Sequence, residues 1–404
     1  GQAEVLTAST QGAQPALVAT LESGKFFGER SLLKGEPTNS SVVAKEDSEL
    51  MCLSKATFEQ LLGPMQGLVE REMKRREDEC LKVAEVKILW ADLEVGKLLG
   101  EGSFGSVRIA VHKLTGTAHA LKALHKGHLI STNQVKNTVN EKTIMKECGH
   151  PFILACLGSF NQKTHVSLLL ELAQGGELFT HMSKVGTLSA QSTALYVAMV
   201  GSALGYLTAR SIAHRDLKLE NLLFDKDGYL KIVDFGFAKK ISDRTWTFCG
   251  TPDYLAPEIL SHKGHNCAVD WWTLGILTYE MLHGEPPFAE DDQMATFKRI
   301  ASGQYRINRT VGKEATDLIQ RLLMHNPAKR LGMLPGGGTD LMCHPMCASI
   351  DAEKLLRKEV KVPWKPKLAD PNDTSNFDEY AEPSSSASKK FDKYLDLKYD
   401  ELWE

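Results

Sequence analysis

Two short polar motifs, thirteen residues apart, constrain this chain of 404 residues more than any other feature. Residues 213–221 read A-H-R-D-L-K-L-E-N, and Asp234-Phe235-Gly236 follows. Phosphoryl transfer needs a carboxylate that orients the attacking hydroxyl, and oxygen ligands that hold Mg²⁺ beside the phosphates. Asp216 can supply the carboxylate, and Asn221 and Asp234 can supply the ligands. The motifs therefore predict a fold that brings both segments to one site.

A glycine-rich segment lies upstream, between apolar runs at residues 93–99 and 107–111. Gly100, Gly102, Gly105 and Val107 fit the pattern G-x-G-x-x-G-x-V. Glycines let the backbone N–H groups of a hairpin approach phosphates that a Cβ atom would hold away. A second strand follows, where a dinucleotide-binding fold would have a helix. The pattern therefore predicts a β-hairpin, which by itself is more often an ordinary hairpin than one that covers phosphates.

A lysine and a glutamate complete the polar set. Lys122 lies seventeen residues beyond Gly105, at the end of an apolar strand, and can reach beneath the hairpin. Glu141 lies in a helical stretch predicted around residues 135–148. A buried lysine requires a carboxylate partner, and Glu141 is the candidate. Alone, each residue would be interpreted as a surface charge, so the prediction rests on the ordered set.

The order continues with Ala256-Pro257-Glu258 and Asp270-Trp271-Trp272, and it matches the protein-kinase signature. Residues 93–347 resemble a eukaryotic protein kinase domain of the AGC group, which contains the cyclic-AMP- and cyclic-GMP-dependent kinases. The specific motifs are R-T-W-T-F-C-G-T-P at residues 244–252 and N-F-D-E-Y at residues 376–380. The resemblance implies an α+β fold with a small antiparallel-sheet lobe and a mainly helical lobe. It also implies ATP and Mg²⁺ as cofactors and transfer to serine or threonine.

The resemblance implies a role for each site residue. Lys122 would pair with Glu141 and the α- and β-phosphates, Asp216 would be the catalytic base, and Lys218 would touch the γ-phosphate. Asn221 and Asp234 would bind the metal. The remaining ATP-binding residues would be Leu99, Gly100, Gly102, Ser103, Phe104, Gly105, Val107, Ala120, Glu171, Ala173 and Leu223. Phe377 and Tyr380 resemble tail residues that lie across the nucleotide pocket, and Phe391 with Tyr394 resembles a hydrophobic motif that docks on the small lobe.

Substrate choice and activation are also implied. Glu177, Glu220 and Glu280 match carboxylates that hold substrate arginines in basophilic kinases, and such pairs are charge-assisted. The protein partners would therefore carry basic serine or threonine sites, with Thr251 in the substrate-binding set. An apolar residue after the acceptor is favoured by Phe248, Pro252 and Leu255. Leu219 stands where relatives usually carry proline, and it affects fine specificity. Thr247 is the expected phosphorylation site, paired with Arg215 and Lys239.

Short apolar stretches at residues 4–10, 16–21, 41–44 and 50–53 predict antiparallel strands. Residues 1–63 resemble the second half of a cyclic-nucleotide-binding domain. The pointers are F-G-E-R-S-L-L at residues 27–33 and P-T-N-S-S-V at residues 37–42. Glu29 would hold the ribose, but Thr38 stands where an arginine would neutralise the cyclic phosphate. A cyclic nucleotide is therefore a doubtful partner. A regulatory domain joined directly to a kinase favours the cyclic-GMP-dependent subfamily.

The flanking segments complete the organisation. The charged run at residues 70–79 indicates a solvated helix within a linker at residues 64–92, and residues 348–404 form an extended tail. The first strands of the N-terminal barrel are expected to be missing, since the pattern begins partway through.

Composition excludes several classes of protein. With 48 basic and 51 acidic residues, the net charge of −3 gives no overall field for nucleic acid or an anionic membrane. No apolar run reaches the roughly 18 residues of a membrane span. The eight cysteines form no C-x-x-C blocks, which indicates reduced thiols and a cytoplasmic protein.

Four alternatives are weighed against an active protein kinase. A catalytically dead scaffold would be expected to lack Lys122, Asp216, Asn221 or Asp234, and all four are present. A small-molecule kinase would not be expected to carry the segment at residues 244–258. A pure cyclic-nucleotide sensor accounts for only the first 63 residues. A phosphate-loop NTPase is excluded, because no G-x-x-x-x-G-K-S/T run is present.

Overall fold

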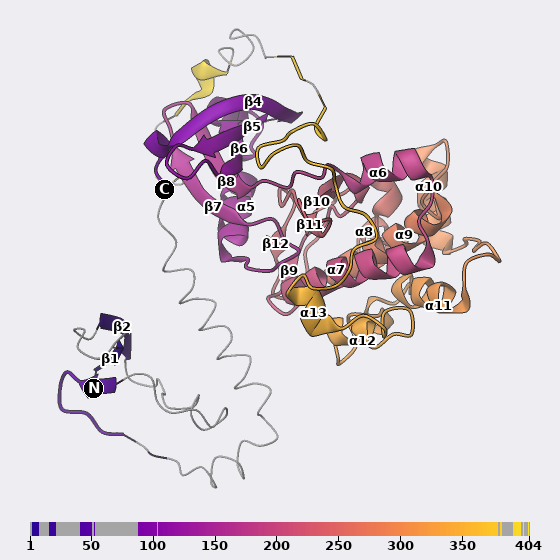
Figure 1. Ribbon diagram of the computed structural model, residues 1–404. Helices are drawn as coiled ribbons and strands as arrows, with labels where there is room; N and C mark the ends of the chain where they lie inside the picture. The colour runs from indigo at the N-terminus through magenta and orange to yellow at the C-terminus, as the bar shows by residue number, and fades with distance from the viewer. Residues whose placement is uncertain are drawn as a thin grey trace. The chain divides into compact units, whose positions relative to one another are not determined.

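The chain divides into two units, Gly1–Val86 and Lys87–Glu404. The computed structural model describes residues 2–7, 16–21, 41–50, 52, 88–102, 104–378, 380–381, 391–396, 399 and 403 (Figure 1). Within the first unit, strand β1 (Ala3–Thr7) pairs antiparallel with both β2 (Ala16–Leu21) and β3 (Ser41–Ala44). These strands agree with the expected antiparallel pattern.

One further strand predicted for the first unit is not observed, and the other predictions for this unit concern residues that the structure does not describe. The apolar stretch at residues 50–53 is not a strand at its described positions, Leu50 and Cys52. Glu29, Arg30, Thr38 and the expected linker helix at residues 70–79 lie outside the described residues.

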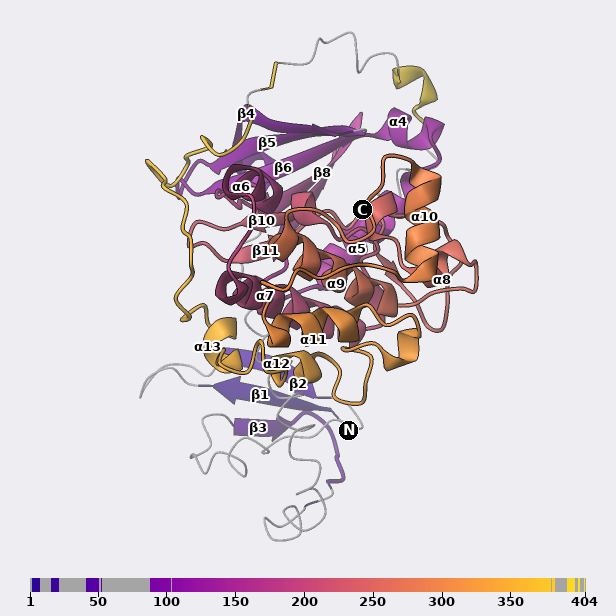
Figure 2. The same ribbon diagram turned by 90° about the vertical axis from the view of Figure 1, so that its right-hand side faces the viewer.

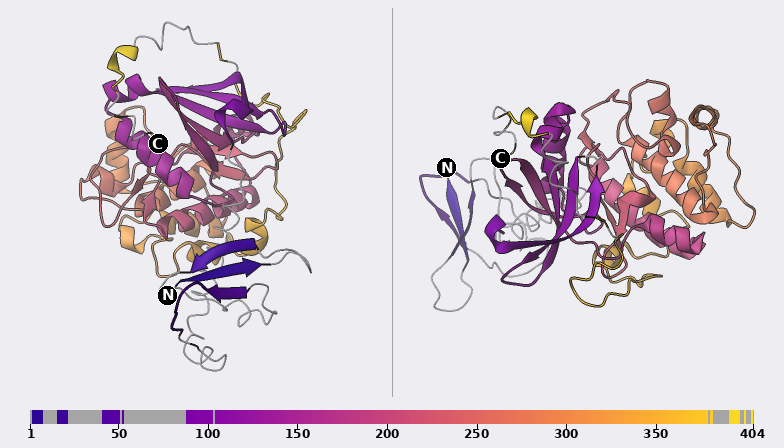
Figure 3. Two further views of the ribbon diagram at one scale, coloured as in Figure 1. Left: turned by 90° about the vertical axis from the view of Figure 1, so that its left-hand side faces the viewer. Right: turned by 90° about the horizontal axis from the view of Figure 1, so that it is seen from above.

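The second unit begins with a five-stranded antiparallel sheet of order β4-β5-β6-β8-β7 (Figure 1). Its strands are β4 (Leu93–Gly102), β5 (Gly105–His112), β6 (Ala118–His125), β7 (Cys156–Asn161) and β8 (His165–Glu171). Helix α4 (Lys126–Ser131) follows β6, and α5 (Val135–Glu147) follows α4. Helix α5 contacts β7 and lies on the side of the sheet toward the helical lobe (Figure 3). The small antiparallel-sheet lobe that the sequence resemblance implies is therefore confirmed.

Alternation along the strands decides which side chains meet the site. Successive residues of a strand point to opposite faces. Leu121 and Leu169 therefore belong to an outer cluster with Leu93 and Ala110. Their neighbours Ala120, Leu168 and Leu170 belong to the main core of the unit. Lys122, two residues beyond Ala120, points to this same inner face.

The helical lobe is built around α7 (Ala190–Thr208) and α9 (Ala268–His283), which contact each other. Residues 190–208 contain no charged side chain, so α7 can be buried on most of its surface. Around this pair lie α6 (Leu178–Val185), α8 (Pro257–Leu260), α10 (Gln293–Ser302), α11 (Lys313–Leu322), α12 (Gly338–Met342) and α13 (Ala352–Leu356) (Figure 2).

Short elements between α7 and α9 carry the polar motifs. Strands β10 (Leu222–Phe224) and β11 (Leu230–Ile232) form one antiparallel pair, and β9 (Ile212–Ala213) with β12 (Lys239–Lys240) forms another. The 3-10 turns η3 (Leu219–Asn221) and η4 (Pro252–Tyr254) complete these loops.

Beyond α13 the chain runs along the side of the unit from the helical lobe up to the sheet (Figure 2). Polar contacts hold it there. The Tyr229 hydroxyl donates to the carbonyl of Val360 at 2.5 Å. The Gln174 side chain donates to the carbonyls of Pro371 and Asp373, at 3.0 and 3.1 Å. The tail is therefore fastened to the helical lobe and to the segment between β8 and α6.

The chain end shows which aromatic residue anchors the tail. Phe391 stacks on His128 with ring centroids 3.9 Å apart, while Tyr394 is 42% exposed. Trp403 is only 1% exposed and packs in a cluster with Leu124, Leu129, Val135 and Val166. The sequence analysis named Phe391 and Tyr394 for this docking role and missed Trp403, which is the buried residue.

Candidate active site

The base of the site is an ion pair between the sheet and helix α5. Lys122 Nζ lies 2.6 Å from Oε1 of Glu141 and 3.6 Å from Oδ1 of Asp234. Burial alone would lower the pKa of Lys122, but the two carboxylates outweigh it and hold the pKa well above its ordinary value. Burial also opposes ionisation of Asp234, yet Lys122 holds the pKa of that carboxyl below its usual range. The site therefore carries a fixed ammonium beside a fixed carboxylate.

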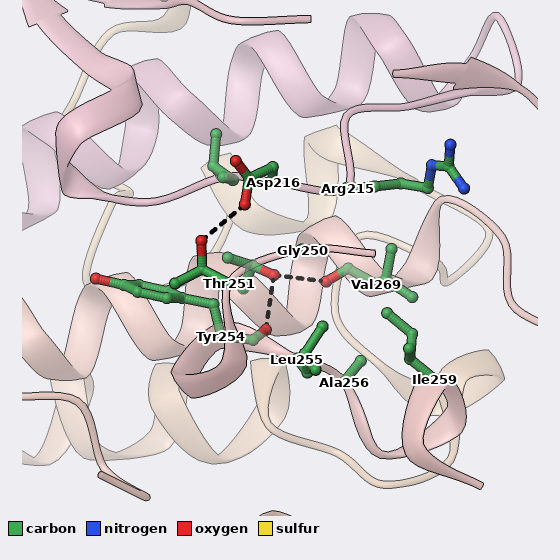
Figure 4. Close-up of a pocket in the computed structure, with 11 residues that line it drawn as sticks. Arg215, Asp216, Gly250, Thr251, Tyr254, Leu255, Ala256, Ile259 and Val269 are labelled. Carbon is green, nitrogen blue, oxygen red and sulfur yellow. Dashed lines mark hydrogen bonds between the residues drawn. The ribbon is translucent and has the colours of Figure 1, made fainter. Parts of the chain in front are cut away.

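Asp216 is held through both of its carboxylate oxygens. Its Oδ1 accepts a hydrogen bond of 2.8 Å from the Thr251 hydroxyl (Figure 4). Its Oδ2 accepts one of 3.3 Å from the Asn221 amide, and Lys218 Nζ lies 3.9 Å from the same oxygen. Asp216 is 7% exposed, so these contacts set its orientation in a largely buried place.

The loop that carries Asp216 is anchored by a carboxylate from helix α9. Asp270, 2% exposed, accepts hydrogen bonds of 2.7 and 2.8 Å from the backbone N–H groups of His214 and Arg215. Arg215 has φ +69°, a left-handed conformation that is costly for a residue with a side chain. The two bonds to Asp270 offset that cost and fix the backbone directly before Asp216.

The glycine hairpin between β4 and β5 leaves room for a ligand. A Cβ atom at Gly105 would lie 1.9 Å from the carbonyl oxygen of Ala123, so only glycine fits there. A Cβ atom at Gly100 would meet no atom within 4 Å. This open space lies in the hairpin whose neighbouring strand carries Lys122, which is the arrangement that an anionic phosphate requires.

Other residues expected at the nucleotide belong to the sheet, to the segment after β8 and to β10. Leu99, Ala120 and Ala173 are buried, while Val107 and Leu223 are partly buried against the main core. Phe104 packs its ring 5.4 Å from that of His128, so its side chain belongs to the small-lobe cluster. Ser103 lies outside the described residues. The Glu171 carboxylate pairs with Lys231 at 2.6 Å.

Three carboxylates gather beside the catalytic loop. The Tyr254 hydroxyl donates to Oε2 of Glu280 at 2.7 Å. Burial raises the pKa of Glu280 to about 7, with Glu220 adding to the shift and the Tyr254 bond opposing it. Burial, and then Glu220, also raises the pKa of Glu177. Oε2 of Glu220 is buried without a hydrogen-bond partner. This oxygen can therefore accept a hydrogen bond from a cationic side chain.

The segment around Thr247 places polar groups next to an exposed hydroxyl. Lys239 Nζ donates to Oγ1 of Thr245 at 3.0 Å, and that oxygen lies 3.5 Å from Oγ1 of Thr247. Arg215 Nε donates to the carbonyl of Phe237 at 2.8 Å, while its Nη1 is buried with no hydrogen-bond partner. Donors for an added phosphate are therefore present in this segment.

Two contributors were not assigned by the sequence analysis. Asp270 was noted only as part of a motif, although its place in D-W-W was a usable signal for its anchoring role. Lys231 was not noted at all, and no motif points to it.

Comparison with known families settles the class of the protein. Residues 93–346, more than half of the chain, match the protein kinase domain model. The chain belongs to the protein kinase family. Residues 1–63 of this kinase match the cyclic nucleotide-binding domain model. The match to a cyclic nucleotide-binding domain thus precedes the match to a protein kinase domain along the chain.

The kinase is similar to cyclic-nucleotide-dependent enzymes. It is 36% identical to cGMP-dependent protein kinase 2 of Mus musculus over 93% of this chain and 54% of the relative. It is 40% identical to the human cAMP-dependent protein kinase catalytic subunit PRKX, over 72% of this chain and 81% of the relative. The chain spans about half the length of the cGMP-dependent relatives, as the 51% coverage of Caenorhabditis elegans egl-4 also shows. In the described part of the chain, no helix is long and apolar enough to cross a membrane.

Proposed function

We propose that this kinase transfers the γ-phosphoryl group of ATP to serine or threonine hydroxyls in proteins with arginine-rich sites. The supporting observation is the joint placement of Lys122, Glu141, Asp234 and Asp216. A fixed ammonium and a fixed carboxylate lie on the strand beside the glycine hairpin and at the D-F-G motif. Asn221, whose amide donates to Asp216, accepts at its carbonyl a hydrogen bond of 3.0 Å from the N–H of Val233, the residue before Asp234. These are the parts that phosphoryl transfer requires.

Mg·ATP fits the donor groups of the site. Mg²⁺ takes oxygen ligands and neutralises charge between the β- and γ-phosphates when it is bound. Asp234 and the amide oxygen of Asn221 would hold it, because the Asn221 nitrogen already donates to the carbonyl of Asp216 at 2.8 Å. Lys122 would hold the α- and β-phosphates, and Lys218 would contact the γ-phosphate.

Asp216 would orient the attacking hydroxyl and accept its proton. Its two oxygens are held by Thr251 and Asn221, so the carboxylate needs little rearrangement when a hydroxyl arrives. Lys218 Nζ lies 3.9 Å from Oδ2 of this carboxylate, on the side of Asn221. A catalytically dead scaffold would have no need for this arrangement.

Arginine is the residue that the acidic group fits best. Burial and, after it, the Glu220 carboxylate raise the pKa of both Glu177 and Glu280, and Oε2 of Glu220 is buried without a hydrogen-bond partner. A guanidinium can bind carboxylates in a bidentate manner and would relieve the repulsion between them. Protein substrates with arginine near the acceptor are therefore the proposed partners.

Two regulatory features accompany this activity. Phosphorylation of Thr247 would pair its phosphate with Arg215 and Lys239 and order the segment. A cyclic nucleotide remains a weak candidate ligand because Thr38 replaces the expected arginine. The seven cysteines that the structure describes form no disulfide, which supports placement in the cytoplasm.

A peptide-library assay tests the proposal. The purified kinase is given radiolabelled ATP, Mg²⁺ and peptides in which arginine is varied around a fixed serine or threonine, with and without cyclic AMP and cyclic GMP. Transfer that depends on arginine and is lost in Asp216→Asn is expected. Absence of transfer by the Thr247-phosphorylated protein, or equal transfer to acidic peptides, would overturn it.

A further inference from the structure

One buried ion pair touches the nucleotide site but has no role in the mechanism above. Lys231 of β11 places its Nζ 2.6 Å from Oε2 of Glu171, the last residue of β8. The Lys231 side chain is 6% exposed and that of Glu171 is 31% exposed. The pair thus joins the helical lobe to the segment that connects it with the sheet, called the hinge here and defined as residues 170–173.

The same carboxylate holds a third segment. Oε2 of Glu171 also accepts a hydrogen bond of 3.4 Å from the N–H of Ala155, and the N–H of Glu171 donates to the carbonyl of Ala155 at 2.9 Å. Ile232, next to Lys231, forms a parallel bridge with Ile153. The segment before β7, the hinge and β11 therefore meet at this ion pair.

The position of the pair relates it to the adenine site. Lys231 is the cross-strand partner of Leu223 in the β10–β11 pair, and Leu223 is a proposed adenine contact from the helical lobe. Glu171 and Ala173 are proposed contacts from the hinge. The ion pair therefore borders both walls of the proposed pocket: Glu171 belongs to the hinge wall, and Lys231 pairs across the strands with Leu223 of the other wall.

We propose that Lys231 is a positioning residue that sets the spacing between the hinge and β10, and thereby the affinity for the adenine nucleotide. This inference rests on the proposed function, since it assumes that the nucleotide binds between these walls. Lys231 itself acts through Glu171 and does not touch the nucleotide.

The surrounding charges explain why the buried Lys231 ammonium depends on Glu171. Burial lowers the pKa of Lys231, and the nearby Lys358 lowers it further, while Glu171 and Asp225 oppose the shift. Asp225 already pairs with Lys358 at 2.6 Å, which leaves Glu171 as the close partner of Lys231. A buried ammonium without its partner is unfavourable, so loss of Glu171 would displace the lysine.

The chain offers a matched control in the pair Lys358 and Asp225. Its N–O distance is also 2.6 Å, and one partner is again buried, with side chains 28% and 6% exposed. It fastens the tail to the turn between β10 and β11, where Asp225 Oδ1 accepts from the N–H groups of Asp227 and Tyr229. The Lys358–Asp225 pair does not contact the hinge. Its removal therefore measures the effect of destabilising the same β10–β11 hairpin without changing the hinge contact.

The experiment compares nucleotide binding with catalysis in Lys231→Met, Glu171→Gln, the double variant, Lys231→Arg and Lys358→Met. The Kd of a fluorescent ADP analogue, measured without peptide, and the KM for ATP are expected to rise about five- to tenfold in both single variants. The kcat and the KM for peptide should change less than about twofold in Lys231→Met. The double variant should add little to either single one, and Lys231→Arg should restore most of the affinity.

Several outcomes would overturn the inference. The Kd of Lys231→Met could equal that of the wild type, whether or not its melting temperature falls. Alternatively, the Kd could rise as much in Lys358→Met as in Lys231→Met. If Lys231→Met does not fold, the Kd of Lys231→Gln, which removes the charge and keeps a polar side chain, decides in the same way. A wild-type protein that binds the analogue but transfers no phosphate would contradict the proposed function, while the binding measurements would still decide the inference.

Discussion

The Thr251 hydroxyl donates a 2.8 Å hydrogen bond to Oδ1 of Asp216, and so joins two segments separated by 35 positions in the chain. Thr251 begins the turn before A-P-E, and Asp216 lies in the H-R-D motif. The bond leaves Oδ2 of Asp216 to Asn221 and Lys218. The order of the segment around Thr251 is therefore coupled to the orientation of the proposed catalytic base.

Removal of the Asp216 carboxylate or of the Lys122 ammonium should strongly reduce the kinase activity. In Asp216→Asn the hydroxyl-orienting carboxylate is lost, and in Lys122→Met the phosphate-binding ammonium is lost. We expect kcat to fall about 10²- to 10⁴-fold in each, measured by steady-state phosphate transfer. Lys97→Met, which replaces an exposed lysine of β4, is the control and should keep its rate. Near-wild-type turnover by either site variant would contradict the assignment.

Thr247 should carry a phosphate in the active kinase. Its hydroxyl is close to Thr245, which Lys239 contacts, and Arg215 has a buried donor without a partner. Because charge-assisted hydrogen bonds contribute about 1.5–3 kcal/mol each, Thr247→Ala should lower kcat/KM at least about tenfold. Mass spectrometry of an active preparation checks the modification. Ser242→Ala, at an exposed position in the same segment, is the control, and an active but unmodified protein would refute the prediction.

Much of this site could be predicted from the sequence because its parts lie in short local motifs. The helix expected around residues 135–148 is α5 (Val135–Glu147), and Lys122 does pair with Glu141. The glycine hairpin and both strands beside it are also present. In these cases the spacing along the chain fixes which side chains share a face.

Other features depend on register and long-range packing, which local patterns do not encode. Lys231 meets Glu171 only because β11 pairs with β10 in one register and lies beside the end of β8. Trp403 is buried in a pocket made by residues of β6, α4, α5 and β8, all more than two hundred positions away. No periodicity near the chain end marks that tryptophan as the anchor.

Affinity for arginine-containing peptides should depend on pH through Glu280. Burial raises the pKa of Glu280 to about 7, so the group is neutral below that pH and a carboxylate above it. The KM for an arginine peptide is therefore expected to fall about fivefold as the pH rises through about 7, since a charged acceptor binds a guanidinium more strongly. Initial rates over a pH series test this. Glu280→Gln should raise the KM for the peptide and make it nearly independent of pH. If KM changes with pH in that variant as it does in the wild type, Glu280 is not the group responsible.

The buried pair of Arg330 and Glu258 should matter for folding stability. Arg330 is 0% exposed and binds both oxygens of Glu258, at 2.8 and 3.1 Å. Arg330→Met leaves a buried carboxylate unpaired, and we expect a loss of about 3–5 kcal/mol in the free energy of unfolding. Urea denaturation measures it. Arg321→Ala breaks an exposed pair with Asp317, and should cost about 0–1 kcal/mol. Equal losses in the two variants would show that burial of the pair is not the cause.

Cyclic nucleotides should bind this chain weakly or not at all, although residues 1–63 match the cyclic nucleotide-binding domain. Thr38 stands where the resemblance places an arginine, and a hydroxyl supplies no positive charge. A bound cyclic phosphate would lose its hydration without a cation in exchange, at a cost of several kcal/mol. Calorimetry with cyclic GMP and cyclic AMP is expected to show no saturable binding at micromolar concentrations, and the kinase rate should not respond to either. Saturable binding would refute the prediction, and its loss in Arg30→Ala would then identify Arg30 as the cation that replaces the missing arginine.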